Sequence, residues 1–515
     1  MKHLVTAAAL AFAAATPAHA TPPGPVNPLA PKAMGDYQRA VIGDISVGSP
    51  GYLERWEAFN NGFPAADMIA AIESVAGHGL DPADYHLDVL KRVGTTGDDP
   101  TLYALDAWMS AASHIAFGKL KPTRVEPDWT AQGRQADLVA HLRDALATGT
   151  LATSLDRLAP QHASYQALKT ELAARRDRVA NAAAPVPAGP ALKSGMTGAR
   201  VALLQARLGT AQTGLFDADT DAAVRAFQLA QGLDDDGVVG AATLRVLNRD
   251  GRAELDQIRL NMERWRWLPD DLGPKHVRVN IADFSVQAWQ DGAVRRVHNG
   301  IVGKPFRKTP VFSDVIEYAV LNPWWETPAS LARRDKLPQF RRDPAAVDRL
   351  GFQVLSGGQV VNASAIDWKT VPDSMPYRIR QKPGPLNALG QIKIMFPNKH
   401  NVYLHDTPDR GLFAQRQRAF SSGCIRTQDP LDLFAWLMDG TDWTRERIQQ
   451  TVDSGRETRV DLPARVPVHV LYMTAVVDSA GVRLVDDIYE RDAAVLAGLN
   501  AGSQSRPDPR FAATP

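Results

Sequence analysis

The chain has 515 residues, too many for one hydrophobic core, so we expect about three or four domains. Its 58 basic and 57 acidic residues give a net charge of +1, and this balance gives no reason to expect nucleic acid as a partner. The single cysteine excludes an intramolecular disulfide bond.

The first twenty residues have the pattern of an export signal. Lys2 and His3 precede an apolar run over residues 4–15, and residues 18–20 (A-H-A) fit a cleavage site between small side chains. The run is shorter than the roughly 20 residues that span a bilayer. We therefore expect residues 1–20 to be a signal peptide and the mature protein to be exported. An uncleaved N-terminal anchor is the alternative.

Residues 44–180 are predicted to form an α-helical scaffold domain. Apolar residues recur at helical spacing over residues 65–72, and residues 102–117 form another helical pattern that Gly118 closes. Asp81 and Pro82 have the composition of a helix start. Residues 181–190 (N-A-A-A-P-V-P-A-G-P) are predicted to be a linker.

Residues 191–249 are predicted to form a small three-helix unit. Its helical segments at residues 201–208, 222–230 and 241–244 are separated by turns that contain G-L-F-D and D-G-V-V-G. This order resembles the small peptidoglycan-binding module of many cell-wall enzymes. The resemblance implies glycan binding, and a spacer that no longer binds glycan is the alternative.

Residues 256–495 are predicted to be mostly β, which makes the whole chain a multidomain α+β protein. Short runs of β-branched and aromatic residues recur there, and Asp291-Gly292 has the composition of a hairpin turn. Residues 324–383 interrupt the β pattern with a basic, partly helical stretch. A long insertion near a site often serves as a lid, and a surface loop without function is the alternative. Residues 500–515 are polar and are expected to be disordered.

The only cysteine, Cys424, lies nineteen residues (424 − 405 = 19) after His405, which ends a short apolar run. A thiol with an ordinary pKa of about 8.5 needs a base to become a nucleophile at neutral pH. If a strand begins at Ile425 beside the strand that ends at His405, the cysteine and histidine side chains can meet. The sequence therefore predicts a thiol nucleophile with a histidine base.

Two neighbours of Cys424 are further candidates. Gly423 allows a substrate carbonyl to approach the backbone closely, and the N–H groups of Gly423 and Cys424 are candidates for an oxyanion hole. Arg426 lies two residues after Cys424 and is expected on the same face of a strand. It could bind a substrate carboxylate or lower the pKa of the thiol.

His405 and the run Ser421-Ser422-Gly423-Cys424-Ile425-Arg426 resemble the signature of the YkuD-type L,D-transpeptidases of bacterial cell walls. Many members carry a second histidine where this chain has Ser422, which leaves His405 as the only histidine base in the motif. Together with residues 403–408 (Y-L-H-D-T-P), 322–325 and 383–390, the motif is similar to the large Gram-negative branch typified by YcbB. That branch combines a helical scaffold, a peptidoglycan-binding module and a lid insertion.

The resemblance implies a reaction and a location. Cys424 would attack the third residue of a donor tetrapeptide stem, His405 would protonate the leaving D-Ala, and a neighbouring stem's amine would resolve the thioester into a 3→3 cross-link. Tyr403, Ser422 and Arg426 are expected to contact substrate. Trp324 and Trp325 are expected to do so as well. Together with the predicted signal peptide, the resemblance implies periplasmic location. It also implies acylation by carbapenems, with no metal or cofactor.

Other readings of the same residues remain open. A Cys/His murein peptidase would use water as the acceptor, and a transpeptidase variant would use the lysine of a wall lipoprotein. The alternative from a different class is a non-catalytic wall-binding protein. The intact Cys424, His405 and Gly423 argue against a vestigial site.

Overall fold

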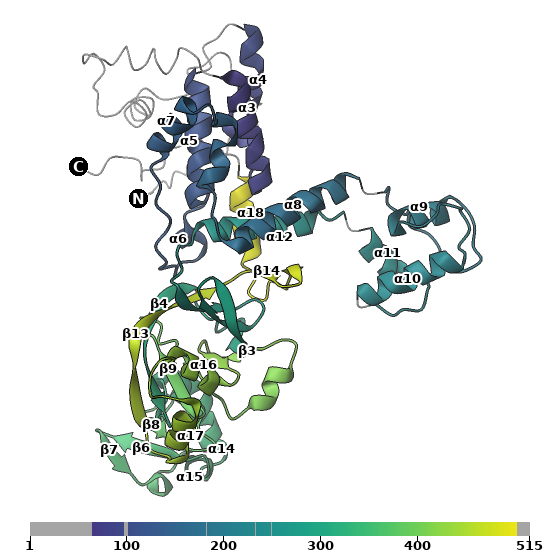
Figure 1. Cartoon of the computed structure of the whole chain (residues 1–515). Coiled ribbons are helices and arrows are strands. Elements are labelled where there is room, and N and C mark those ends of the chain that lie inside the picture. The colour runs from purple at the N-terminus through teal and green to yellow at the C-terminus, as the bar shows by residue number, and fades with distance from the viewer. Residues whose placement is uncertain (1–63, 97–100, 182, 232, 249, 502–515) are drawn as a thin grey trace, which may run out of the picture.

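The computed structural model describes residues 64–96, 101–181, 183–231, 233–248 and 250–501 (Figure 1). The predicted signal peptide, residues 44–63 and residues 502–515 of the predicted tail lie outside the described residues. In the described part of the chain, no helix is both long and apolar enough to cross a membrane.

The N-terminal domain is helical, as predicted. Asp81 begins η2 by accepting a hydrogen bond from the Ala83 N–H, with Pro82 at the first position, as the sequence indicated. Its α-helices are α3 (Ala65–Ser74), α4 (Leu87–Thr96), α5 (Thr101–Phe117), α6 (Pro122–Val125), α7 (Leu138–Ala147) and α8 (Ala163–Ala180). The 3₁₀-helices are η1 (Val75–His78), η2 (Pro82–Tyr85) and η3 (Leu151–Leu158).

Two distant helices complete the core of this domain. Apolar residues of α12 (Arg252–Arg266) and α18 (Asp492–Asn500) pack in the same cluster as Trp108 of α5. A hairpin of β14 (Ala475–Asp478) and β15 (Gly481–Leu484) lies beside α8. Most of α12 and residues 492–495 of α18 were predicted to belong to the catalytic segment 256–495. They pack on the helical side because α12 is buried around most of its circumference and needs apolar neighbours there.

The three-helix unit has a small core of its own and stands apart from the other helices and the sheet (Figure 1). It consists of α9 (Ala199–Leu208), α10 (Ala218–Ala230) and α11 (Ala241–Leu247). Val186, inside the predicted linker, is buried in this core, and its N–H and C=O both bond to the Asn248 side chain. The second half of the predicted linker is therefore part of the unit.

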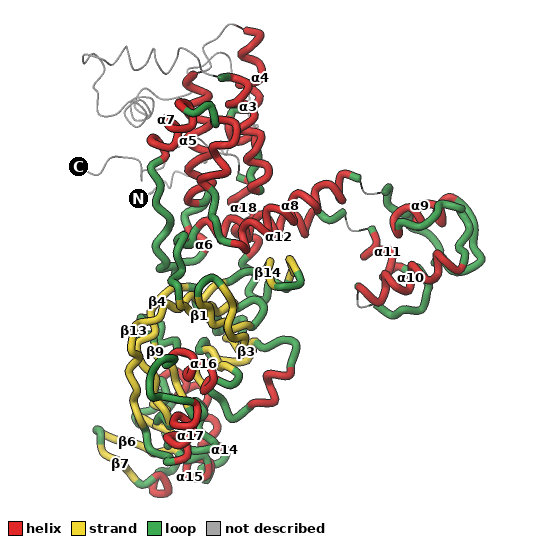
Figure 2. Tube along the Cα trace, in the orientation of Figure 1, coloured by secondary structure: helices red, strands yellow, loops and turns green. Residues whose placement is uncertain are grey.

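The C-terminal half is built on a sheet that closes on itself (Figures 1 and 2). The strand order is β11-β3-β12-β10-β9-β4-β13-β1-β2, and β2 also pairs with β3. The hairpin between β2 and β3 turns at Asp291 and Gly292, both with positive φ, as predicted. The strands are β1 (Lys275–Asn280), β2 (Ser285–Gln290), β3 (Ala293–Gly303), β4 (Phe312–Leu321), β9 (Ile392–Met395), β10 (Leu404–His405), β11 (Ala419–Ser421), β12 (Ile425–Thr427) and β13 (Thr458–Leu471).

The helices α16 (Pro430–Leu437) and α17 (Arg445–Asp453) cover the sheet, and η6 (Arg410–Ala414) follows β10. Leu433 and Phe434 of α16 are fully buried with the inward-facing valines of β1. This packing gives the closed sheet an apolar interior and leaves its outer face for polar side chains.

The predicted insertion at residues 324–383 is a compact subdomain between β4 and β9. Phe340 and Trp368 are fully buried in a core that is separate from the interior of the closed sheet. Its helices are α13 (Ala329–Leu331), the π-helix η4 (Ala332–Lys336), α14 (Leu337–Arg342), α15 (Ala346–Arg349) and η5 (Ala363–Ala365). It also contains a four-stranded sheet that was not predicted, made of β5 (Trp325–Glu326), β6 (Phe352–Ser356), β7 (Gln359–Val361) and β8 (Arg378–Gln381).

Candidate active site

Two short parallel strands bring the predicted catalytic residues together. β10 pairs with β12 so that Leu404 faces Ile425 and His405 faces Arg426. The predicted strand start at Ile425, beside the strand that ends at His405, is confirmed. Leu404 and Ile425 point into the apolar interior. By strand alternation His405 and Arg426 lie on the outer face, and the preceding Cys424 lies toward the same face.

His405 is oriented as a neutral base. The side chain is 5% exposed, and Nδ1 lies 2.5 Å from the carbonyl oxygen of Asp406. A carbonyl only accepts hydrogen bonds, so Nδ1 carries the proton and Nε2 keeps its lone pair. Burial, with a smaller contribution from the Arg426 charge, lowers the pKa of His405 to about 3. The imidazole is therefore neutral at physiological pH.

Cys424 is a protonated thiol in this structure. Burial raises its pKa to about 11, although hydrogen bonds from Tyr403 and the charge of Arg426 act in the opposite direction. In the described structure, Sγ donates to the carbonyl oxygen of Asn401 at 3.6 Å and not to His405. The site is thus a neutral thiol and a neutral imidazole on one face, and the described structure shows no hydrogen bond between them.

Tyr403 lies between the closed sheet and the insertion. Its ring packs edge-on against His405, with the ring centroids 5.6 Å apart, and also contacts the core of the insertion. Burial raises the pKa of the Tyr403 hydroxyl, and the neighbouring Cys424 adds to this shift. The structure therefore brings Tyr403 to the site, where it stays protonated.

The turn at residues 421–424, here called the nucleophile turn, is closed by one serine. Ser421 Oγ donates to the Cys424 carbonyl at 2.6 Å and accepts from the Gly423 N–H at 3.1 Å. The φ of Gly423 is 120°, a conformation that favours glycine. Because the Gly423 N–H is already bonded inside the turn, the Cys424 N–H is the better of the two predicted oxyanion donors.

Arg426 is brought to the site, but it already has a carboxylate partner. Its Nη1 lies 3.2 Å from Asp409 Oδ2, with 21% of the arginine side chain exposed. Its charge opposes the rise in the pKa of Cys424, which is the direction predicted for the thiol. It also adds to the fall in the pKa of His405, an effect that the sequence did not indicate. A substrate carboxylate would have to compete with Asp409 for this guanidinium.

Ser422 is exposed and accepts a hydrogen bond from Arg307 Nη1 at 2.8 Å. Arg307 makes a bidentate ion pair with Asp335 of η4, at 2.8 and 2.9 Å. The insertion is therefore tied to the nucleophile turn through one arginine. No sequence pattern marks Arg307 or Asp335 as part of the site, whereas Ser421 carries a signal because it lies within the motif.

The two tryptophans are placed differently from each other. Trp325 is 8% exposed and belongs to the core of the insertion, where Lys336 lies over its ring. Trp324 has Arg380 over its ring at 4.4 Å. None of the contacts that the structure describes joins either side chain to Cys424, so neither is part of the constellation around the nucleophile.

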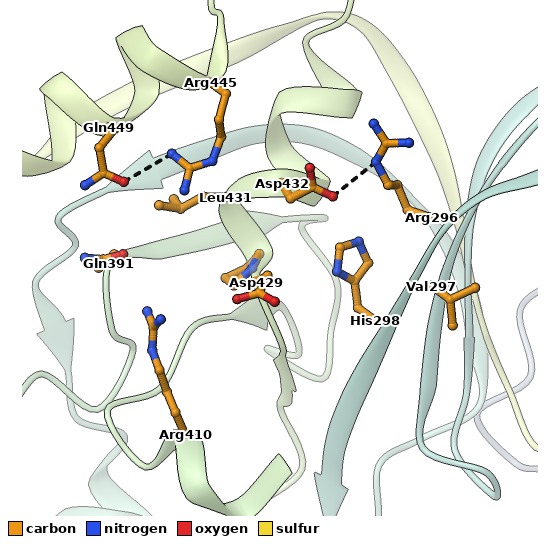
Figure 3. A pocket seen from close by; sticks show the side chains of 11 residues that line it. Arg296, Val297, His298, Gln391, Arg410, Asp429, Leu431, Asp432, Arg445 and Gln449 are labelled. Atoms are coloured by element: carbon orange, nitrogen blue, oxygen red, sulfur yellow. Dashed lines mark hydrogen bonds and ion pairs between the residues drawn. The ribbon is translucent and has the colours of Figure 1, made fainter. Parts of the chain in front are cut away.

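A pocket of about 640 Å³ (Figure 3) lies beyond the C-terminal end of β12. Cys424 precedes the opposite, N-terminal end of this strand. The pocket mixes both charges, with Arg296 paired to Asp432 on one side and Arg445 bonded to Gln449 on another. Its lining residues are Arg296, Val297, His298, Gln391, Arg410, Asp429, Pro430, Leu431, Asp432, Arg445 and Gln449. None of the predicted site residues lines it. Within the described residues, no group of three or more His, Cys, Asp or Glu side chains is arranged to hold a metal ion.

Family comparisons agree with the three structural units. Residues 58–172 match the "Scaffold domain" model and residues 197–247 the "Putative peptidoglycan binding domain" model. Residues 274–453 match the "L,D-transpeptidase catalytic domain" model, named YkuD. A "Putative L,D-transpeptidase" from Haemophilus influenzae is 34% identical over 246 residues, which are 47% of this chain and 50% of that protein. This chain therefore aligns with about half the length of its relative.

Two solved structures are also similar in part. An L,D-transpeptidase from Xylanimonas cellulosilytica is 20% identical and aligns over 55% of this chain and 99% of its own, with a TM-score of 0.17. L,D-transpeptidase 1 of Mycobacterium tuberculosis is 13% identical and aligns over 38% of this chain and 61% of its own, with a TM-score of 0.16. The sequence signature and the family matches together identify residues 274–453 as a YkuD-type L,D-transpeptidase catalytic domain, in a chain that also carries a peptidoglycan-binding domain.

Proposed function

We propose that this protein is a periplasmic peptidoglycan L,D-transpeptidase that forms 3→3 cross-links through a thioester on Cys424. The observation that carries the proposal is the parallel pairing of β10 with β12, which sets His405 and Cys424 toward one face of the sheet. The hydrogen bond from Nδ1 to the Asp406 carbonyl supports Nε2 as the base, because it leaves that nitrogen unprotonated.

The first half-reaction begins from the neutral pair. As Sγ attacks the carbonyl carbon of the donor's third residue, Nε2 of His405 takes the thiol proton, and the oxyanion forms near the Cys424 N–H. The carbon–nitrogen bond to D-Ala then breaks. The imidazolium returns its proton to the leaving amine, which leaves a thioester and a neutral His405.

The second half-reaction repeats these roles in reverse. The side-chain amine of the acceptor stem attacks the thioester carbonyl and transfers a proton to Nε2. The carbon–sulfur bond breaks, and the proton returns from the imidazolium to Sγ. No other reactant is consumed, because the energy of the new amide comes from the amide that was cleaved.

The insertion is proposed to act as a lid over the donor. Its Asp335 is linked through Arg307 to Ser422, and its core contacts Tyr403. A covered site would exclude water, and this favours an amine acceptor over hydrolysis. This contact is the reason for preferring transpeptidation to the Cys/His murein peptidase.

The test is to incubate the purified protein with tetrapeptide-containing muropeptides and to analyse the products by mass spectrometry, beside Cys424→Ala. A cross-linked dimer that lacks one D-Ala supports transpeptidation. Free tripeptide without dimer would instead identify a peptidase. Unchanged activity of Cys424→Ala would exclude the mechanism. Incubation with a carbapenem should add the mass of the drug to the wild type and not to Cys424→Ala.

A further inference from the structure

A buried threonine from a distant loop holds the nucleophile turn in place. Thr309, between β3 and β4, is fully buried, and its Oγ1 donates to the Gly423 carbonyl at 2.9 Å. The same oxygen accepts the Gly303 N–H at 2.9 Å. The Thr309 hydroxyl therefore accepts from the Gly303 N–H and donates to the Gly423 carbonyl. Its hydrogen points toward Gly423, because that carbonyl is the acceptor.

Tyr489 fixes the position of Thr309 through backbone hydrogen bonds. Its hydroxyl accepts the Thr309 N–H at 3.2 Å and donates to the Gly303 carbonyl. The loop is tightly packed here, because a Cβ on Gly303 would lie 2.1 Å from the Arg307 carbonyl oxygen. The position of Thr309 relative to the turn is thus set by the Tyr489 hydroxyl and by close backbone packing.

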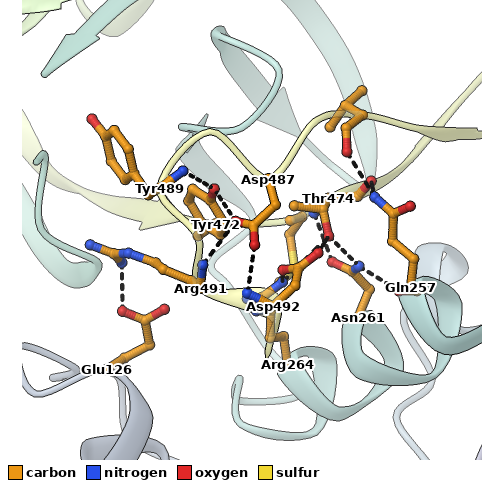
Figure 4. Close-up of polar contacts among 12 residues, drawn as sticks. Glu126, Gln257, Asn261, Arg264, Tyr472, Thr474, Asp487, Tyr489, Arg491 and Asp492 are labelled. Atoms are coloured by element: carbon orange, nitrogen blue, oxygen red, sulfur yellow. Dashed lines mark hydrogen bonds and ion pairs between the residues drawn. The ribbon is translucent and has the colours of Figure 1, made fainter. Parts of the chain in front are cut away.

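The hydrogen bonds continue from Tyr489 toward α18 (Figure 4). The Tyr489 N–H donates to the Tyr472 hydroxyl at 2.8 Å, which donates in turn to Asp487 at 2.6 Å. The carboxylate of Asp487 also accepts the backbone N–H groups of Arg491 and Asp492, at 2.9 and 2.8 Å. Asp487 therefore connects Tyr472 with the first turn of α18.

The far end of this network lies in the scaffold domain. Arg491 Nη1 binds Glu126, which follows α6, at 2.5 Å (Figure 4). Arg491 Nη2 lies 3.4 Å from the Thr309 carbonyl. The two side chains are 15% and 6% exposed, so the pair is largely removed from solvent. One guanidinium thus touches both the scaffold domain and the residue that bonds to the nucleophile turn.

Fixing the Gly423 carbonyl has a consequence for catalysis. A trans peptide group is planar, with its C=O and N–H pointing in opposite directions, so holding the Gly423 carbonyl toward Thr309 directs the Cys424 N–H away from it. We propose that Thr309 and Tyr489 are positioning residues that aim the Cys424 N–H at the oxyanion, and that the scaffold domain supports them through Glu126 and Arg491. This inference rests on the proposed acyl-transfer function of Cys424.

The first experiment separates acyl transfer from simple thiol reactivity. Acylation of Cys424 by a carbapenem develops an oxyanion, whereas alkylation by iodoacetamide does not. Thr309→Val removes the hydroxyl with little change in shape, and Thr309→Ser keeps it. We expect Thr309→Val to slow acylation by about tenfold, less than the roughly 10²–10³-fold loss when an oxyanion donor itself is removed. Alkylation should be unchanged, and Thr309→Ser should acylate like the wild type.

Three results would overturn the inference: wild-type acylation by Thr309→Val, equal slowing in Thr309→Ser, or a parallel fall in alkylation. If Thr309→Val does not fold, Tyr489→Phe replaces it. That variant loses the hydroxyl that holds Thr309, and the same ratio of acylation to alkylation rates decides the result.

The second experiment tests the contribution of the scaffold. Glu126→Gln removes the charge that binds Arg491, and we expect a several-fold slower acylation with unchanged alkylation. Thr130→Val is the matched control, because Thr130 also bonds from the helical half to the sheet, at Ser313, without reaching the nucleophile turn. If the two substitutions slow acylation equally, or if Glu126→Gln does not slow it, the scaffold domain does not support the nucleophile turn.

Failure of this inference is distinguishable from failure of the proposed function. If Cys424→Ala abolishes acylation while Thr309→Val acylates normally, the function stands and the positioning role falls. If Cys424→Ala is still acylated, the function itself is wrong.

Discussion

Arg307 and Asp335 form a bidentate ion pair that joins the insertion to the catalytic half of the chain, with N–O distances of 2.8 and 2.9 Å. Arg307 also donates to Ser422, the residue next to Gly423 in the nucleophile turn. This pair raises the pKa of the arginine and lowers that of the aspartate, chiefly through their hydrogen bond. The geometry makes Asp335 the natural point at which to loosen the insertion without touching the nucleophile.

Asp335→Asn should weaken this link. We expect the KM for the donor muropeptide to rise several-fold with a smaller change in kcat, because the covered state becomes less populated. The melting temperature should change little, since a partly exposed ion pair contributes at most about 1 kcal/mol. Asp343→Asn is the control: its ion pair with Arg349 lies wholly within the insertion. Equal kinetic effects of the two substitutions would argue against a lid.

His405→Asn should remove the base while leaving the nucleophile in place. We expect kcat/KM for the donor to fall by about 10²–10⁴, the usual contribution of general acid–base catalysis. Steady-state assay of D-Ala release measures this loss, and circular dichroism checks the fold. Cys424 in this variant should still react with iodoacetamide at high pH. A rate within a few-fold of the wild type would assign the base elsewhere.

The pKa values predict how thiol reactivity depends on pH. With the pKa of Cys424 raised to about 11, the thiolate fraction of the free protein should grow about tenfold per pH unit from neutral pH to about pH 10. Iodoacetamide alkylation followed by mass spectrometry should show this slope. With the pKa of His405 lowered to about 3, no inflection is expected between about pH 5 and 8. Flat alkylation across that range would instead indicate a thiolate–imidazolium pair.

His469 should make folding sensitive to acid. Burial lowers its pKa from 6.5 to about 4, so between these values the unfolded chain binds more protons than the folded one. The contribution of His469 to the free energy of unfolding should therefore be fully present above pH 6.5 and be lost as the pH falls toward 4. This loss is on the order of 3 kcal/mol.

Urea unfolding at several pH values of the wild type and His469→Gln checks this prediction. The variant should lose stability less steeply as the pH falls. Ser313→Ala is the control, because it removes the hydroxyl bonded to His469 Nδ1 without removing a titrating group. An unchanged slope in His469→Gln would place the acid sensitivity in other residues.

Local patterns in the sequence predicted much of the architecture. Helix starts such as Asp81-Pro82 and the hairpin at Asp291-Gly292 depend on the backbone preferences of a few adjacent residues, and both occur where expected. The multidomain α+β organisation was also predictable from the sequence, because the hydrophobic pattern changes from helical to strand-like spacing along the chain. The pairing of His405 with the strand at Ile425 was predicted from a motif whose two parts are close in sequence and joined by one loop.

Contacts between segments that are distant in sequence could not be predicted from local patterns. Nothing in the periodicity of α12 or α18 indicated that they complete the helical core, because an apolar face does not specify its partner. The same limit applies to the insertion, whose strands are short and whose sheet depends on pairing between β5 and β8.

By itself, the sequence determined which groups can react: one cysteine, a histidine base at motif spacing, and a glycine that permits the tight turn. The tertiary structure decided their state and their support. Burial keeps both the Cys424 thiol and the His405 imidazole neutral. The Ser421 hydroxyl accepts the hydrogen bond of the Gly423 N–H. Thr309, 114 residues from Gly423, orients the peptide group between Gly423 and Cys424. These properties depend on desolvation and on hydrogen bonds between distant segments, which exist only after the chain has packed.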